Sequence, residues 1–383
     1  MSKKYRGINL DGNAVELTVD NGLIVEVSPI AEVSGLPYLL PVLVDVQHNG
    51  ALGQAYNNLV PGDDAAMRKI AGHLLSHGVG RVLATFTTTD YPRLERAAGA
   101  IAEILDRDPE LNSLFPGIFH EGVFISPDKG WRGGHAPEFI MPPDWDKFAR
   151  LNELSGNRVK VVNVAPEVPG TLEFIKKAAA AGIKVALGHC HPDTGTIRKA
   201  ADAGATMITH FANGSAPEIH RFNNPFWGFL DEERLCPGLV GDGFHLPPEV
   251  VRTAIRCKGA ENCFMVSDAN IYSGCAPGLY HRIGGLDCVI EKNGFIHVAG
   301  QEILAGAYFS QNRCVEFLSQ KCGVDYLTAW KMASVNPARI AGIDLPMLRC
   351  QDEASFVICR DNRMEKTVFK GVEYSIKGDM IDE

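Results

Sequence analysis

The chain has 383 residues, 45% of them hydrophobic, and its formal net charge at pH 7 is -9. This length and composition predict a globular protein with a large core. The net negative charge and the absence of Lys or Arg runs argue against a nucleic-acid or anionic-membrane partner, so a small-molecule partner is favoured. No signal peptide or membrane-spanning run is visible, and the ten cysteines, none in a C-x-x-C pair, indicate reduced thiols and a cytoplasmic location.

The two ends of the chain carry the same kind of pattern. Residues 1–40 contain short alternating runs, "AVELTV" and "LIVEVS", next to the turn signals "DGN" and "DNG". Residues 344–383 repeat this style in "SFVICRDNRMEKTVFKGVEYSI". We therefore expect both ends to join in one small β-sandwich domain.

Between them, residues 41–343 alternate β-type runs with stretches of helical period such as 65–78 and 171–182. Eight such runs are present, which is the number that a closed parallel barrel requires. The sequence therefore predicts an α/β fold, a (β/α)8 TIM barrel, with strands within 41–49, 81–89, 117–122, 158–167, 184–190, 207–211, 238–245 and 263–269. The segments 126–145 and 214–230 are interpreted as long loops at the barrel rim rather than as helices.

Most of these runs end in polar residues, and the C-terminal ends of barrel strands face the active site. On the first strand, Gln47 and Asn49 lie two residues apart and so share a face, which we expect to point into the barrel mouth. His48 then points toward the surrounding helices and is interpreted as structural.

Three further strands end in residues of the types that commonly act as metal ligands. Glu121, His189 and His210 follow the third, fifth and sixth strands. One carboxylate and two neutral imidazoles form a sound three-ligand set for a single Zn²⁺ or similar divalent ion, with a position left open for water. Each residue alone could equally be a hydrogen-bonded polar group at a loop junction, but their joint placement favours the metal site.

Asp268 ends the eighth strand. A carboxylate opposite the metal ligands can take a proton from metal-bound water and deliver it to a leaving group. The alternative is a structural cap. An unpaired carboxylate at a buried rim is costly unless a positive charge lies nearby, so the catalytic role is favoured.

The ordered motifs "DVQHNG", "HEG", "GH", "THFAN" and "SDAN" resemble the amidohydrolase superfamily, specifically the N-acetylglucosamine-6-phosphate deacetylases, over nearly the whole chain. The resemblance implies one ion held by Glu121, His189 and His210, no metal at Gln47 and Asn49, and a homodimer. It also implies removal of the acetyl group from N-acetylglucosamine 6-phosphate, giving glucosamine 6-phosphate and acetate. Lys160 lies too near the start of the fourth strand to be the bridging lysine of two-metal relatives.

The resemblance also assigns substrate contacts. Asn213, Arg221 and His245 match residues that hold the sugar phosphate, and backbone N–H groups near Gly214 would complete the cradle. His135 matches a loop histidine near the scissile amide. The plainer alternatives are an Asx-type loop former for Asn213, a solvated charge for Arg221 and a turn residue for His245.

Several departures from the family pattern leave the substrate open. Val123 replaces a usual proline, the loop around Trp131 is longer, "FANGSAPEIHRFNNP" replaces a shorter motif, and His191 adds an imidazole that is interpreted as supporting the site. The alternatives are an amidohydrolase for another N-acyl substrate, either a different amino sugar or an N-acyl amino acid, and a non-catalytic barrel that binds a sugar phosphate. Zn²⁺ is the expected metal, with Fe²⁺ or another divalent ion as alternatives.

Overall fold

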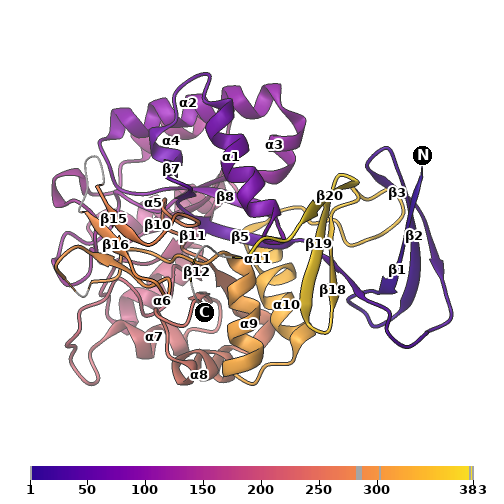
Figure 1. The fold of residues 1–383 in the computed structure, drawn as a ribbon. Helices are drawn as coiled ribbons and strands as arrows, with labels where there is room; N and C mark the ends of the chain where they lie inside the picture. Colours follow the sequence, from indigo (N-terminus) through magenta and orange to yellow (C-terminus); the bar gives the residue numbers. More distant parts are fainter. Residues whose placement is uncertain (1, 282–286, 302, 379–380, 382–383) are drawn as a thin grey trace.

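The computed structural model describes residues 2–281, 287–301, 303–378 and 381. Eight parallel strands form a single sheet that curls into a nearly closed barrel (Figure 1). In barrel order these are β14 (Phe264–Val266), β13 (Cys236–Val240), β12 (Ala205–Ile208), β11 (Lys184–Leu187), β10 (Val159–Val164), β9 (Gly117–His120), β8 (Val79–Phe86) and β5 (Leu43–His48). All eight strands predicted from the sequence are confirmed.

The barrel closes between β5 and β14, the two ends of the sheet. The backbone N–H of Asp268 donates to the carbonyl of Gln47 at 3.0 Å, and that of Asn49 donates to the carbonyl of Ala269 at 3.1 Å. This seam lies directly beside the strand ends that carry the polar residues.

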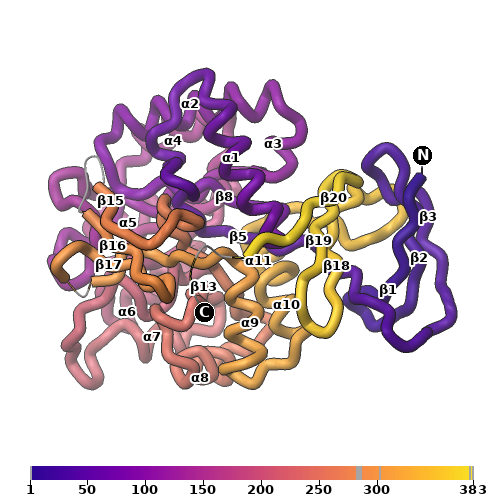
Figure 2. The backbone as a smooth tube through the Cα atoms, in the orientation of Figure 1, coloured from indigo at the N-terminus to yellow at the C-terminus, as the bar shows by residue number. Residues whose placement is uncertain are grey.

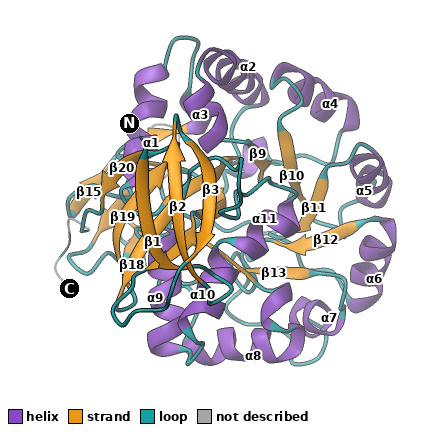
Figure 3. Cartoon of the chain, turned by 90° about the vertical axis from the view of Figure 1, so that its right-hand side faces the viewer, coloured by secondary structure: helices purple, strands orange, loops and turns teal. Residues whose placement is uncertain are grey.

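Helices surround the barrel (Figure 3). They are α1 (Asp64–Leu75), α2 (Tyr91–Arg107), α3 (Pro109–Leu114), α4 (Trp145–Leu154), α5 (Thr171–Ala180), α6 (Thr194–Ala203), α7 (Pro225–Asp231), α8 (Pro248–Lys258), α9 (Gln311–Lys321), α10 (Tyr326–Ala333) and α11 (Val335–Ala341). Alternate strand residues such as Val46, Phe119 and Met207 fill the barrel interior, and Ala338 and Ile340 of α11 pack against this same cluster. The barrel is therefore a packed core whose chemistry is confined to its rim.

Strands from both ends of the chain form one seven-stranded mixed sheet, seen in Figure 2 beside the barrel. Its order is β20 (Val372–Ser375), β19 (Arg363–Phe369), β18 (Phe356–Arg360), β4 (Tyr38–Pro41), β1 (Lys3–Ile8), β2 (Ala14–Asp20) and β3 (Leu23–Pro29). The sheet bends so that its halves share a core, in which the rings of Tyr5 and Phe356 meet edge to face with centroids 5.0 Å apart. The prediction that the two ends share a β structure is confirmed.

Two features differ from the sequence interpretation. The predicted loop 214–230 runs into a short helix, α7, which begins at Pro225 because the Asn224 side chain caps it by accepting from the N–H of Phe226 at 3.0 Å. A small antiparallel sheet also follows the eighth barrel strand, formed by β15 (Gly278–Tyr280), β16 (Cys288–Ile290) and β17 (Ile296–Val298).

The remaining elements are short, namely β6 (Gly50–Ala51), β7 (Gln54–Ala55) and the 3-10 turns η1 (Tyr56–Asn58), η2 (Pro137–Phe139) and η3 (Ala260–Asn262).

Among the described residues, every helix is too short or too polar to span a bilayer.

Candidate metal centre

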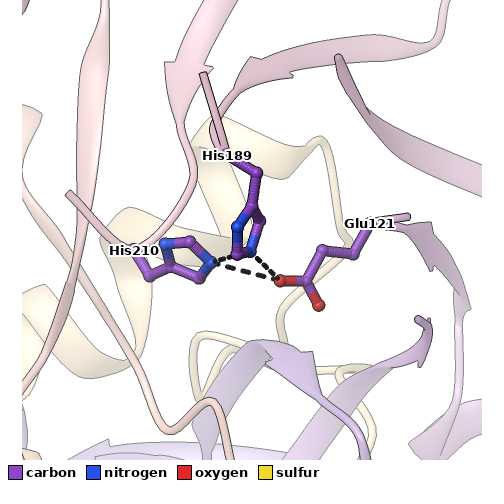
Figure 4. A group of neighbouring side chains, drawn as sticks. All are labelled: Glu121, His189 and His210. Carbon is purple, nitrogen blue, oxygen red and sulfur yellow. Dashed lines mark hydrogen bonds and ion pairs between the residues drawn. The ribbon is translucent and has the colours of Figure 1, made fainter. Parts of the chain in front are cut away.

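Glu121, His189 and His210 converge at the barrel mouth, as Figure 4 shows. Nε2 of His210 lies 3.2 Å from Oε1 of Glu121 and 2.9 Å from Nε2 of His189, and the His189–Glu121 distance is 3.5 Å. All three side chains are buried. The three strand ends therefore bring one carboxylate oxygen and two imidazole nitrogens to a common point.

This geometry fits a divalent ion. A tetrahedral ion about 2.0–2.2 Å from each ligand atom separates those atoms by about 3.3–3.6 Å, close to the spacing observed. The set of one carboxylate and two imidazoles suits Zn²⁺, Fe²⁺ and similar metals. The residues present thus match the donor chemistry of a single catalytic ion, without fixing which metal it is.

Surrounding groups fix the orientation of His189. Its Nδ1 lies 3.1 Å from the carbonyl oxygen of Trp131. Because a carbonyl can only accept, Nδ1 carries the proton and Nε2 presents its lone pair to the cluster. Gly133 and Gly214 lie against the ring, where a Cβ would approach Cε1 to 3.1 Å and Nδ1 to 2.4 Å respectively. The close approach requires glycine at position 214, and at position 133 the tight contact and a φ of 56° both favour it.

Asn163, on β10, ties the neighbouring strand ends together beneath the cluster. Its Nδ2 donates to the carbonyls of Glu121 at 3.0 Å and Gly188 at 3.2 Å, and its Oδ1 accepts from the Thr209 hydroxyl at 2.8 Å. The fourth strand thus contributes a fully buried amide in place of a metal ligand. Lys160 lies at the second position of this strand, near its start.

His189, His210 and Asp268, at the rim, adopt left-handed backbone conformations that residues other than glycine rarely adopt. The φ angles are 50° at His189, 27° at His210 and 49° at Asp268. Each such residue costs about 1–3 kcal/mol and persists only where the surroundings hold it. The chain sharply redirects these side chains toward the mouth as the strands end.

Gln47 connects the cluster to Asp268. Its Nε2 donates to Oε1 of Glu121 at 3.0 Å and to Oδ1 of Asp268 at 3.3 Å, and Asn49 Nδ2 donates to the same Asp268 oxygen at 2.9 Å. His48 points away, with Nδ1 2.9 Å from the Tyr56 hydroxyl. The structure therefore brings Gln47, Asn49 and Asp268 to the cluster and leaves His48 in the core.

The charges of the cluster shift the pKa values of its members. Burial acts to raise the pKa of Glu121, but the interactions with the neighbouring imidazoles of His189 and His210 outweigh burial and hold that pKa below its usual range. Burial acts to lower the pKa of His210, yet the hydrogen bond to Glu121 and the charge of Asp268 raise it. The pKa of Asp268 is raised by burial and by the negative charge of Glu121. A cation at this point would relieve that repulsion.

His245 belongs to a buried ion pair at the end of β13. Its Nδ1 lies 2.7 Å from Oδ2 of Asp242, whose Oδ1 accepts from the backbone N–H groups of Phe244 and His245 at 2.9 Å each. Burial acts to lower the pKa of His245, but the charge of Asp242 and their hydrogen bond raise it. The ion pair therefore favours the protonated form of the imidazole, which is a charge-assisted donor.

His135 lies against the metal cluster. Its Nε2 is 3.2 Å from Nε2 of His189, and its Nδ1 is 2.7 Å from the hydroxyl of Thr88. The loop 126–145 therefore carries this imidazole to the mouth from outside the barrel strands.

The remaining predicted residues lie on the rim loops. Asn213 follows His210 closely, and its backbone N–H donates to the His210 carbonyl at 2.9 Å. Arg221 is exposed, with its guanidinium carbon 5.3 Å from the centroid of the Phe222 ring. Among the described residues, the contacts of Arg221 are with its own loop and not with the metal cluster.

His191 does not join the metal ligands. It is held by Glu167, which lies 2.9 Å from its Nδ1, and by Asp128, 3.0 Å from its Nε2, and it stacks on Trp131 with the planes 14° apart. His191 and Trp131 also line a surface pocket of about 400 Å³. His191 supports the loop that positions His189, through Trp131.

Among the residues that contact the site, Asn163, Asp242 and Thr88 were not predicted from the sequence. Asn163 lies within β10, and Asp242 and Thr88 lie two residues beyond the ends of β13 and β8. Only their positions near strand ends could have marked them as candidates.

Comparison with known proteins agrees with this geometry. No family model matches the chain. The chain is 30% identical to N-acetylglucosamine-6-phosphate deacetylase of Danio rerio over 333 residues, covering 84% of this chain and 80% of the relative. It is 27% identical to N-acetylgalactosamine-6-phosphate deacetylase of Escherichia coli O157:H7, covering 86% and 85% of the two chains.

A solved structure has the same fold. A mutant of the Mycobacterium smegmatis N-acetyl-D-glucosamine-6-phosphate deacetylase, in complex with N-acetyl-D-glucosamine-6-phosphate, superposes with a TM-score of 0.84 at 24% identity. The match covers 94% of this chain and 95% of the other.

Proposed function

The chain belongs to the N-acetylglucosamine-6-phosphate deacetylase family of the amidohydrolase superfamily and is a deacetylase, and on this premise we propose that it hydrolyses N-acetylglucosamine 6-phosphate to glucosamine 6-phosphate and acetate with one divalent metal ion. The observation that carries the proposal is the buried cluster of Glu121, His189 and His210, linked through Gln47 to Asp268. Zn²⁺ is the metal we propose, with Fe²⁺ as the alternative.

Asp268 would move the protons of the reaction. When bound, the ion lowers the pKa of a water molecule to about 7 and polarises the acyl oxygen. The Asp268 carboxylate accepts a proton as the water oxygen bonds to the acyl carbon, and it returns this proton to the sugar nitrogen as the C–N bond breaks. Its raised pKa suits a group that must both take and give a proton.

His245, Asn213, Arg221 and backbone N–H groups near Gly214 are proposed to bind the sugar phosphate. The ion pair with Asp242 supports this role for His245, because it favours the protonated imidazole and fixes its orientation. Arg221 would have to reach inward from its exposed loop. His135, held by Thr88, is proposed to contact the sugar beside the scissile amide.

A substrate panel tests this proposal. We expect kcat/KM to be highest for N-acetylglucosamine 6-phosphate and to fall steeply for unphosphorylated N-acetylglucosamine, since binding energy from the remote phosphate contributes to catalysis. Arg221→Ala and His245→Gln should each reduce the ratio of kcat/KM between the phosphorylated and the unphosphorylated substrate. Equal rates with and without phosphate would instead support an amidohydrolase for another N-acyl substrate.

A second candidate substrate is N-acetylgalactosamine 6-phosphate, because a relative of similar coverage is named for it. The same panel separates the two, since they differ only in the orientation of one hydroxyl. A non-catalytic sugar-phosphate-binding barrel is the remaining alternative. About one equivalent of metal together with turnover would exclude it.

A homodimer is the proposed assembly. Phe222 and Trp227, beside Arg221, are 74% and 57% exposed, which is unusual for large apolar side chains and typical of an interface. Light scattering of the purified protein would measure its mass directly.

A further inference from the structure

A buried carboxylate, Asp45, lies on β5 two residues before Gln47 and takes no part in the proposed chemistry. It is fully buried, yet it accepts hydrogen bonds from three groups of the barrel seam. We propose that Asp45 is a positioning residue for Asp268 in the deacetylation reaction, an inference that rests on the proposed role of Asp268 as proton carrier.

The seam needs such a residue because its strands pair incompletely. β14 has three residues, and its end meets β5 through the isolated bridge between His48 and Ala269. Asp45 Oδ1 accepts from the backbone N–H of Ser267 at 3.2 Å and of Gln47 at 3.3 Å. One carboxylate oxygen thus joins both strands immediately below the catalytic aspartate.

The second carboxylate oxygen extends this link past Asp268. Oδ2 accepts a short hydrogen bond from the Ser267 hydroxyl, and that hydroxyl oxygen accepts from the N–H of Ala269 at 3.0 Å. The residues on either side of Asp268 are therefore both held through Asp45. Because Asp268 has φ +49°, a conformation that needs support, this link fixes the direction of its side chain.

The same carboxylate also holds the backbone of Gln47, whose amide donates to Asp268 and Glu121. Asp45 thus holds both the backbone beside Asp268 and the residue whose side chain donates to Asp268, and it does so without touching substrate. A displacement of about 1 Å in a catalytic group can cost about 100-fold in rate.

Steady-state kinetics of Asp45→Ala and Asp45→Asn test this role. We expect Asp45→Ala to lower kcat by about 100-fold with KM within threefold and metal content unchanged. Asp45→Asn keeps an oxygen that can accept from both N–H groups, so it should restore most of kcat. Ser267→Ala, which removes only the hydroxyl link, should lower kcat by about tenfold and remains informative if Asp45→Ala fails to fold.

A double variant and a matched control complete the test. If Asp45 acts through Asp268, Asp45→Ala combined with Asp268→Asn is no slower than Asp268→Asn alone. Gln311→Met is the control, because the Gln311 amide ties the same strands deeper in the barrel, through the carbonyls of Val44 and Met265, without touching the neighbours of Asp268.

If the kcat of the double variant falls by the product of the two single losses, Asp45 does not act through Asp268 and the inference is overturned. It is also overturned if Gln311→Met and Asp45→Ala lose the same stability and the same fraction of kcat. Full activity of Asp268→Asn would instead contradict the proposed function itself, so the two failures are distinguishable.

Discussion

The carbonyl oxygen of Trp131 accepts from Nδ1 of His189 at 3.1 Å, so a loop that follows β9 sets the tautomer of a candidate metal ligand that follows β11. Outer partners of this kind typically change metal affinity by about 10- to 100-fold when they are removed. The loop carrying Trp131 and His135 is therefore part of the metal centre as well as of the substrate site.

Gly214→Ala should disturb that centre directly. The new Cβ would lie 2.4 Å from Nδ1 of His189, and φ at this position is +58°. We expect metal affinity to fall by about tenfold or more, measured by competition with a chelator. Gly62→Ala has a similar backbone, φ +94°, but no neighbour within 4 Å, so it controls for backbone strain. Equal affinities in both variants would contradict the role of close packing.

His210→Ala should release the metal. One imidazole of a three-ligand set is lost, so we expect the metal content to fall from about one equivalent to near zero, with activity lost in parallel. His281→Ala, which removes an exposed imidazole, is the matched control. Elemental analysis of both proteins gives the answer, and retention of the metal in His210→Ala would place the ion elsewhere.

Asp268→Asn should retain the metal and lose turnover. The amide is nearly isosteric and keeps the contacts with Gln47 and Asn49 within reach, but it cannot accept the proton. We expect kcat to fall by about 100- to 10,000-fold at unchanged metal content. Steady-state assays measure this change in kcat, and a wild-type kcat would remove Asp268 as the base.

Asn163→Ala should weaken both the fold and the metal site. The substitution leaves the carbonyls of Glu121 and Gly188 without their buried donor. We expect the free energy of unfolding to drop by about 2–3 kcal/mol, measured by urea denaturation. Asn152→Ala removes a half-buried amide of α4 that accepts from the backbone N–H of Val159 at 3.0 Å, so it should cost less. Equal losses in the two variants would contradict the role of Asn163 as a buried link between strand ends.

The stability contributed by Asp45 should depend on pH. Burial raises its pKa to about 7, so the folded state favours the protonated carboxyl. A raised folded-state pKa gives stability that is present below the unfolded pKa, about 4, and is lost as pH rises toward 7.

We therefore expect the wild type to lose about 3 kcal/mol between pH 5 and pH 8 relative to Asp45→Asn, whose amide does not titrate. Urea denaturation of both proteins across this range measures the difference. A constant difference would show that Asp45 does not titrate there.

The sequence predicted the barrel and the residues at its mouth for one physical reason. Strands buried on both faces read as apolar runs, so the polar residues that end them, such as Glu121, His189 and His210, stand out. The structure brings these three together, and the family comparison confirms the deacetylase assignment.

Other parts could not be predicted because their signals are weak. Asn163 and Asp242 act through partners that are close only after folding. The strands β15 to β17 are three residues each, too short to show alternation. Helix α7 has seven residues that include Pro225 and Gly228, so no helical period is visible.

The sheet shared by the two ends of the chain has a consequence for synthesis. β1, β2 and β3 can pair with one another as soon as they leave the ribosome, but β4 must wait for β18, which is made after the whole barrel. Until then one edge of β4 carries unpaired N–H and C=O groups, which invite association with other chains. Nascent chains stalled before β18 should therefore depend on chaperones even after their barrel has formed.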